Sequence, residues 1–547
     1  MIRTLFRALV VSGALCCAQA TATDAPVVEA PAGVASGEAR DGVHIFRGIP
    51  YAEAPTGQLR WRPPVTAARW DGVRDATRFG PACHQPPSRP GSIYAAAETP
   101  AMSEDCLSLN VWAPADAKDA PVFVWIHGGS LVAGSGSEAM YDGATLAAQG
   151  LVVVTINYRL GALGYLAHPQ LSEESPDGVS GNYGLLDQVE ALRWVQRNVA
   201  AFGGDPDRVT IAGESAGALS VMYLMAAPPA RGLFHRAIAQ SAYMISTPAL
   251  RDPVHGTPSA EESGLALSRA LGVRGLPRLR AMDPQALTVQ AAMSGFFPLG
   301  NVDGQVLPGQ LVEVFDRGGQ APVPILAGFN EGEIRSLRFL LPPAPADGAT
   351  YEAELRARYG DLAEAMLQHY PAANPDEAML ATTRDAMYGW TAERLVRSQT
   401  ALGQPSFLYY FDHGYPAADA AGLHAFHAAE IPYALGTVGA TPPHWPKIPD
   451  TQAERQLAAA LQAYWASFAR DAVPVAEGQP AWQPYAQSRS HLVFAGEPRP
   501  GEHLMPGMFE LVESVVCRRR AHGGLPWHWN VGIVAPPLPG KGASGCP

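Results

Sequence analysis

The chain has 547 residues, of which 47% are hydrophobic and 16% are charged, and its formal net charge is −12 at pH 7. Such a composition is typical of a globular protein, and the length is enough for a large core. The acidic balance argues against binding to nucleic acid or to an anionic membrane surface, since the longest basic run is only Arg518–Arg520.

The N-terminus has the pattern of a secretory signal peptide. Arg3 and Arg7 precede an apolar run over residues 8–17, and small residues at Ala18 and Ala20 match a cleavage site. The run is too short to span a bilayer, and no later stretch approaches about 20 apolar residues. We therefore expect a signal peptide over 1–20, a single domain over 21–547 without a membrane span, and export to the periplasm or the medium.

Four cysteines remain after the signal peptide: Cys83, Cys106, Cys517 and Cys546. In an exported chain they indicate two disulfides, and three pairings are possible. The local pairing, Cys83 with Cys106 and Cys517 with Cys546, closes two short loops. The cysteine spacings contain no C-x-x-C pair, which argues against a zinc site, and no metal is expected.

Apolar runs followed by helical patterns predict an α/β fold. The runs at 121–127 and 151–157 are nearly continuous, as in parallel strands that are buried on both faces. We expect one large, mostly parallel sheet flanked by helices, with helical cap excursions over 243–320 and 335–400. The other expected strands begin at Val43 and lie at 209–212, 236–241, 323–327, 407–411 and 491–494.

The central motif is Gly213-Glu214-Ser215-Ala216-Gly217, which follows the strand at 209–212 and precedes a helical pattern. Glycines two positions on either side of the serine permit a tight turn between strand and helix. Such a turn exposes the hydroxyl at a helix N-terminus, where the helix dipole favours negative charge. The motif predicts a nucleophile at Ser215.

A serine nucleophile needs an imidazole to accept its proton and a carboxylate to orient that imidazole. The strand at 323–327 leads into a loop with two acids, Glu331 and Glu333. Two histidines, His424 and His427, follow the strand at 407–411. Spacing alone does not choose between the two acids or between the two histidines.

The reaction also requires donors for an oxyanion. The sequence His127-Gly128-Gly129-Ser130 follows a buried strand and offers free backbone N–H groups, and the N–H of Ala216 follows the nucleophile. Candidate pocket-wall residues are Tyr94, Phe296, Phe297 and Leu337, which would fit a core role equally well.

These motifs together resemble the type-B carboxylesterase and lipase family of the α/β-hydrolase fold, which includes the cholinesterases. The resemblance implies Glu333 as the acid, His427 as the base and Gly129, Ser130 and Ala216 as oxyanion donors, with Glu214 in a supporting role. It also implies the Cys83–Cys106 disulfide and an ion pair between Arg60 and Glu104. The segments that carry it are 46–60, 103–110, 125–129, 157–159, 181–188, 202–206 and 213–217.

The expected function is hydrolysis of a small-molecule carboxylic ester through an acyl-enzyme, without a cofactor. Two alternatives are cleavage of another acyl bond, such as an amide, a lactone or a specialised aromatic ester, and a non-catalytic binding module. The filled triad positions argue against the binding module. The sequence does not determine the oligomeric state or the acyl preference.

Overall fold

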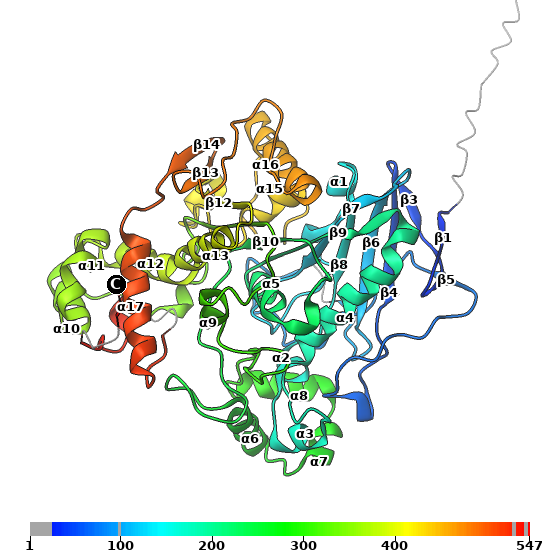
Figure 1. Cartoon of the computed structure of the whole chain (residues 1–547), viewed down its shortest axis with the longest axis horizontal. Coiled ribbons are helices and arrows are strands. Elements are labelled where there is room, and N and C mark those ends of the chain that lie inside the picture. The colour runs from blue at the N-terminus through cyan, green and yellow to red at the C-terminus, as the bar shows by residue number, and fades with distance from the viewer. Residues whose placement is uncertain (1–24, 97–99, 528–531, 541–544, 547) are drawn as a thin grey trace, which may run out of the picture.

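A computed structural model describes residues 25–96, 100–527, 532–540 and 545–546 (Figure 1). The predicted signal peptide over 1–20 lies outside the described residues. Within them, no helix combines the length and the apolar character needed to cross a membrane.

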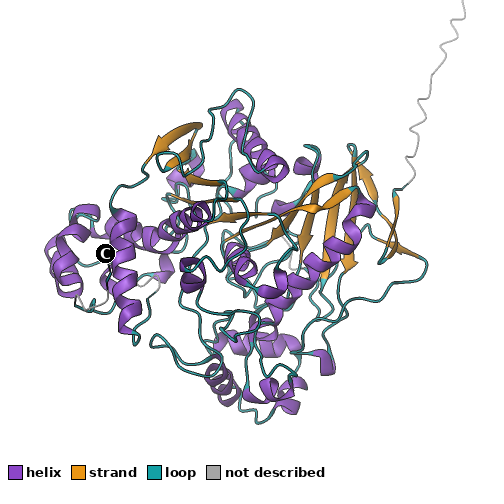
Figure 2. Ribbon diagram, in the orientation of Figure 1, coloured by secondary structure: helices purple, strands orange, loops and turns teal. Residues whose placement is uncertain are grey.

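An eleven-stranded sheet forms the centre of the molecule (Figure 2). Strands β8 through β13 run parallel, and β14, β6, β4 and β3 continue the sheet as antiparallel edges. β7 belongs to the same parallel set, between β8 and β9. In spatial order the strands are β14 (Glu497–Glu502), β13 (Ser490–Ala495), β12 (Ser406–Phe411), β11 (Ile325–Asn330), β10 (Arg236–Gln240), β9 (Gly204–Glu214), β7 (Ala120–Ile126), β8 (Val152–Ile156), β6 (Ser108–Pro114), β4 (Val43–Pro50) and β3 (Glu38–Arg40).

The sheet confirms the predicted α/β class and contains every strand expected from the sequence. It also contains strands that the sequence patterns did not indicate. β14 carries Pro498 and Pro500, which an outer antiparallel strand tolerates because one of its edges forms no ladder. A separate small sheet near the N-terminus consists of β1 (Val27–Ala30), β2 (Gly33–Ser36) and β5 (Val73–Asp75).

Alternate residues of the central strands enter two different cores. In β7, Val122 and Val124 pack in one buried cluster, whereas Phe123 and Trp125 pack in another. This alternation places one core on each face of the sheet. Helices α4 (Tyr183–Asn198), α5 (Ala216–Ala226) and α13 (Trp390–Ala401) supply the first cluster, and α15 (Ile431–Leu435) and α16 (Gln452–Asp471) supply the second.

The two predicted excursions are helical, as expected. In Figure 1 α6, α7 and α8 of the first excursion lie at the bottom of the molecule, and α10, α11 and α12 of the second lie at the left, beside α17 (Met508–His522). The first contains α6 (Ala260–Ala270), α7 (Leu276–Arg280), α8 (Pro284–Met293) and α9 (Leu311–Asp316). The second contains α10 (Gly348–Tyr359), α11 (Ala363–His369), α12 (Pro375–Arg384) and the π-helix Asp385–Gly389 before α13. The remaining α-helices are α1 (Ala144–Ala147), α2 (Gly161–Tyr165), α3 (Pro169–Glu174), α14 (Pro416–Ala420) and α17 (Met508–His522).

Both disulfides of the local pairing are present, between Cys83 and Cys106 and between Cys517 and Cys546. Beside the first, Arg60 donates from Nε and Nη2 to the two oxygens of Glu104, each over 2.6 Å, which is the ion pair that the resemblance implied. A second buried ion pair joins Arg159 and Asp187 across two of the sequence segments that carry the resemblance. The Cys517–Cys546 disulfide instead ties α17 to the C-terminal segment.

The core beneath α16 generates a stability prediction. Leu461 is fully buried against the sheet, so Leu461→Ala should lower the free energy of unfolding by about 2–5 kcal/mol through lost contacts and a cavity. Gln456→Ala, at an exposed position of the same helix, should change it by less than about 0.5 kcal/mol. Denaturant midpoints of the two variants measure the difference, and equal midpoints would contradict this account of the core.

Candidate active site

Loops after four parallel strands meet at one edge of the sheet. Ser215 follows β9, Gly128 to Ser130 follow β7, Glu333 follows β11, and His427 lies in the loop after β12. Parallel strands point their carboxyl ends to the same edge, which is where open α/β sheets bind ligands. The fold therefore brings together residues that lie up to about 300 positions apart in the chain.

Ser215 sits in a strained turn that only small neighbours permit. Its backbone has φ 55° and ψ −121°, outside the regions that L-residues usually adopt. A Cβ on Gly217 would lie 2.0 Å from the carbonyl oxygen of Ile126, and one on Gly213 would lie 2.6 Å from the carbonyl carbon of Gly217. The two glycines thus let β9 turn directly into α5, with Ser215 at the helix N-terminus.

His427 and Glu333 form a buried pair beside this turn. The Nδ1–H of His427 donates to Oε2 of Glu333, and the backbone N–H of Asn330 donates to the other carboxylate oxygen over 2.9 Å. The carboxylate is fully buried, and these bonds satisfy its charge. Because Nδ1 donates, Nε2 of a neutral His427 is left as the acceptor.

The opposite ring nitrogen of His427 faces Glu214, which directly precedes Ser215. His427 Nε2 lies 3.1 Å from Oε1 of Glu214, an oxygen that has no hydrogen-bond partner in the described parts of the chain. The Ser215 hydroxyl likewise forms no hydrogen bond with any described residue. Hydrogen bonds of this kind often form only once substrate is bound.

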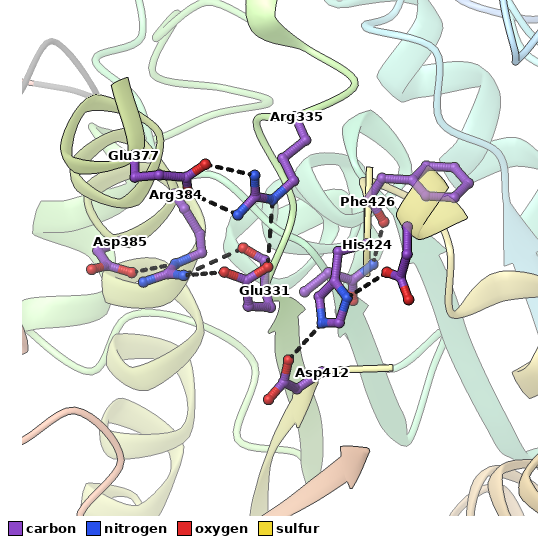
Figure 3. A network of polar contacts seen from close by, with 10 residues as sticks. Glu331, Arg335, Glu377, Arg384, Asp385, Asp412, His424 and Phe426 are labelled. Carbon is purple, nitrogen blue, oxygen red and sulfur yellow. Dashed lines mark hydrogen bonds and ion pairs between the residues drawn. The ribbon is translucent and has the colours of Figure 1, made fainter. Parts of the chain in front are cut away.

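The structure distinguishes between the two candidate acids and between the two candidate histidines. Glu331 pairs with two arginines, Arg384 at 3.3 Å and Arg335 at 3.6 Å (Figure 3). His424 pairs with Asp412 and Asp419 instead of an acid of the β11 loop. Glu333 and His427, the pair that the resemblance implied, are the ones that meet.

The glycine-rich loop after β7 packs directly on the serine turn. A Cβ on Gly128 would lie 2.8 Å from the carbonyl oxygen of Glu214 and 3.3 Å from Cβ of Ser215, so the close approach to the Glu214 backbone requires glycine. Gly129 and Ser130 both have positive φ, 98° and 58°. Among the described residues, the N–H groups of Gly129, Ser130 and Ala216 have no acceptor and are therefore available to an anion at the site.

A polar network that the sequence analysis did not predict is joined to the His427–Glu333 pair through Asn330. Asn330 Nδ2 donates to the carbonyl of Phe426 over 2.9 Å and to Glu430 over 2.6 Å. Gln240 Nε2 donates to the other oxygen of Glu430, and the indole of Trp465 donates to Gln240. No local motif indicated this network, because its members come from segments that lie far apart in the chain.

The buried carboxylates shift the protonation of the site. Burial alone would lower the pKa of His427, but the charges of Glu214 and Glu333 outweigh it and raise that pKa above its usual range. Burial raises the pKa of Glu214, against the opposing charge of His427. Burial and the charge of Glu333 also raise the pKa of Glu430. The site is therefore built to favour a cationic imidazole.

Aromatic side chains surround His427. The Tyr388 ring, from the π-helix, lies with its centroid 5.2 Å from the imidazole, and the Tyr94 hydroxyl donates to the carbonyl of His427 over 3.0 Å. Tyr94 thus reaches the site, as one of the four candidate pocket-wall residues. The other three lie differently: Phe296 and Leu337 pack against hydrophobic clusters, and Phe297 is 60% exposed.

Comparisons with known proteins agree with this arrangement. The model of the carboxylesterase family matches residues 24–504. Fumonisin B1 esterase of Sphingopyxis macrogoltabida is 38% identical over 480 residues, covering 84% of this chain and 85% of that protein. Para-nitrobenzyl esterase of Bacillus subtilis is 34% identical, covering 86% and 95%. A solved PNB esterase structure superposes with a TM-score of 0.76 at 32% identity, covering 89% of this chain and 99% of that one.

The tight turn generates a prediction about Gly217. In Gly217→Ala the new methyl group meets the Ile126 backbone, so the end of β7 must shift, and the free energy of unfolding should fall by about 1–3 kcal/mol. Gly439→Ala is the matched control, because nothing lies within 4 Å of a Cβ there. Thermal denaturation of both variants tests this, and a Gly217→Ala protein as stable as the control would disprove the close approach.

Proposed function

This chain belongs to the carboxylesterase family, whose members hydrolyse carboxylic esters, and we propose that it does so through an acyl-enzyme on Ser215. The observation that carries the proposal is the orientation of His427. One ring nitrogen is bonded to buried Glu333, and the other faces the turn that holds Ser215. This arrangement of base, orienting acid and nucleophile is the one that serine hydrolysis requires.

In the acylation step, Ser215 Oγ attacks the ester carbonyl carbon while His427 Nε2 takes the hydroxyl proton. Glu333 holds the imidazole through Nδ1 and stabilises the charge that forms on it. The N–H groups of Gly129, Ser130 and Ala216 donate to the oxyanion. Collapse of the tetrahedral intermediate breaks the carbon–oxygen bond, and His427 protonates the leaving alcohol.

Deacylation repeats the steps with water. His427 removes a proton from the water as it attacks the acyl-enzyme carbonyl, and the same N–H groups hold the second oxyanion. His427 then returns the proton to Ser215 Oγ, which releases the carboxylic acid. Glu214, 3.1 Å from Nε2, stabilises the cationic imidazole during both steps.

The export of the chain and its single-domain organisation are part of the proposal. Two disulfides support folding in an oxidising compartment, and the N-terminal residues 1–20 have the composition of a signal peptide. The proposed location is the periplasm or the medium.

The acyl-enzyme mechanism predicts large losses for three substitutions. With p-nitrophenyl acyl esters, the wild type should show a burst of product, and Ser215→Ala and His427→Ala should lower kcat/KM by ~10⁴-fold or more. Glu333→Gln should lower it by ~10³- to 10⁴-fold, because the imidazole loses its stabilising carboxylate. Glu331→Gln is the matched comparison and should retain far more activity than Glu333→Gln, because Glu331 pairs with Arg384 and Arg335. An active Ser215→Ala enzyme would refute the mechanism.

The same assay identifies the acyl bond that is preferred. Hydrolysis of matched ester, amide and lactone substrates separates an esterase from another acyl hydrolase on the same residues. Fumonisin B1, the substrate named for one relative, belongs in the ester series. A wild type as inactive as Ser215→Ala across the whole series would favour the non-catalytic binding alternative.

The charge of Glu214 predicts a shift in the pH–rate profile. The base is active only when neutral, so kcat/KM rises as pH passes upward through the pKa of His427. Glu214 raises that pKa, and Glu214→Gln should therefore move the acid limb of the profile to lower pH by roughly 1–3 units. Glu331→Gln should leave the limb in place. An unshifted limb in Glu214→Gln would show that the carboxylate does not act on the base.

A further inference from the structure

His424, the histidine that the proposed mechanism does not use, forms an ionic clamp at the start of the loop that carries His427. Its Nε2 lies 3.0 Å from Oδ1 of Asp412 (Figure 3). Its Nδ1 lies 2.9 Å from Oδ1 of Asp419. A carboxylate oxygen only accepts hydrogen bonds, so both ring nitrogens must donate. His424 is therefore an imidazolium in this arrangement.

The clamp joins the loop to two other elements. Asp412 directly follows β12, and its N–H donates to Phe494 of β13, whereas Asp419 lies in α14. His424 itself has a φ of 49°, a conformation that needs outside support in a residue other than glycine. The two carboxylates supply that support through the side chain.

Only two residues, Ala425 and Phe426, separate the clamp from His427. Both are hydrogen-bonded to the acid loop, the segment 330–333 at the end of β11 that carries Glu331 and Glu333. The N–H of Gly332 donates to the carbonyl of Ala425 over 2.8 Å, and Asn330 donates to that of Phe426. Glu333 comes directly after Gly332. The position of His427 relative to Glu333 is thus set by a short, bonded segment whose outer end is His424.

The acid loop has its own ionic support next to the clamp. Glu331 contacts Arg384 and Arg335, and these arginines also pair with Asp385 and Glu377 respectively (Figure 3). Glu331 also faces His424, so the groups that act on the imidazolium are Asp412, Asp419 and Glu331. The hydrogen bond to Asp412 is the main cause that raises the pKa of His424 to about 9, with Asp419 and Glu331 adding to it.

A metal ion is the competing occupant of this cluster. Ligand atoms of Glu331, Asp412 and His424 lie within 4.8 Å of one another, a spacing that could hold a cation. However, both His424 nitrogens already face carboxylates, and Glu331 already faces two guanidinium groups. A divalent cation would have to displace these charges, which favours a protonated clamp over a metal site.

We propose that His424 is a positioning residue, whose contacts to Asp412 and Asp419 hold His427 at the distance from Glu333 and Ser215 that turnover requires. The inference rests on the proposed function of His427. The clamp is partly exposed, so its effect on stability is small, whereas a small displacement of a base costs much more in rate.

The sign of the pH effect follows from the raised pKa of His424. The clamp is complete below the ordinary histidine pKa, near 6.5, and is lost as pH rises through about 9. His424→Gln has no charge at any pH, and His424→Arg keeps its charge throughout. His424→Gln therefore corresponds to the wild type with neutral His424, and His424→Arg corresponds to the wild type with protonated His424.

The test is kcat per active site, with the active fraction counted from the burst amplitude on a p-nitrophenyl ester. At pH 7 His424→Gln should lower kcat about tenfold with KM within about twofold, and His424→Arg should restore most of it. The ratio of wild-type to His424→Gln kcat should fall toward one as pH rises through about 9. Taking the ratio removes the titration of His427, which both enzymes share. His44→Gln, in β4, is the control and should match the wild type.

The outcomes distinguish the clamp from the proposed function. A ratio near one at pH 7, or a ratio that does not change with pH, would overturn the clamp while the burst still supports the acyl-enzyme. Absence of a burst in the wild type would refute the proposed function itself. Loss of activity on chelation by EDTA, with recovery on adding Zn²⁺ in the wild type but not in His424→Gln, would overturn the clamp in favour of a metal site.

Discussion

The site depends on one buried interaction, the hydrogen bond from His427 Nδ1–H to Glu333. A carboxylate without solvent contact is costly unless donors satisfy it, and the structure meets this need with His427 and the backbone of Asn330. Because the same bond fixes the tautomer, Nε2 is left to face the serine turn. The buried Glu333 carboxylate needs hydrogen-bond donors, and this need determines the orientation of the His427 imidazole.

The electrostatic balance around that bond is unusual for a protein core. Glu214, Glu333 and Glu430 are all buried near a single imidazole, and burial raises the pKa values of Glu214 and Glu430. Amide donors from Gln240 and Asn330 offset part of the cost at Glu430. In the proposed mechanism, this excess of acid stabilises the imidazolium that forms when Ser215 gives up its proton.

The parallel sheet makes this concentration of charge possible. Its strands are buried on both faces and end at one edge, so loops from distant parts of the chain converge without a long connection between them. Glycines at 128, 213 and 217 then allow backbones to approach more closely than side chains would permit. Close packing around these contacts sets the distances between the groups of the proposed catalytic site.

The sequence by itself determined the features that depend on local patterns: the buried strands, the turn at Ser215 and the pairs of candidate acids and histidines. It did not determine which acid and which histidine meet, and only family resemblance favoured Glu333 and His427. The tertiary structure decided that geometry, because a residue's position in a loop does not fix the direction of its side chain. It also revealed β14, whose prolines hide a strand pattern, and the contacts of Gln240, Trp465 and Asn330 with Glu430, which join distant segments. These features arise from packing between elements, and a pattern of residues along the sequence does not show which elements pack together.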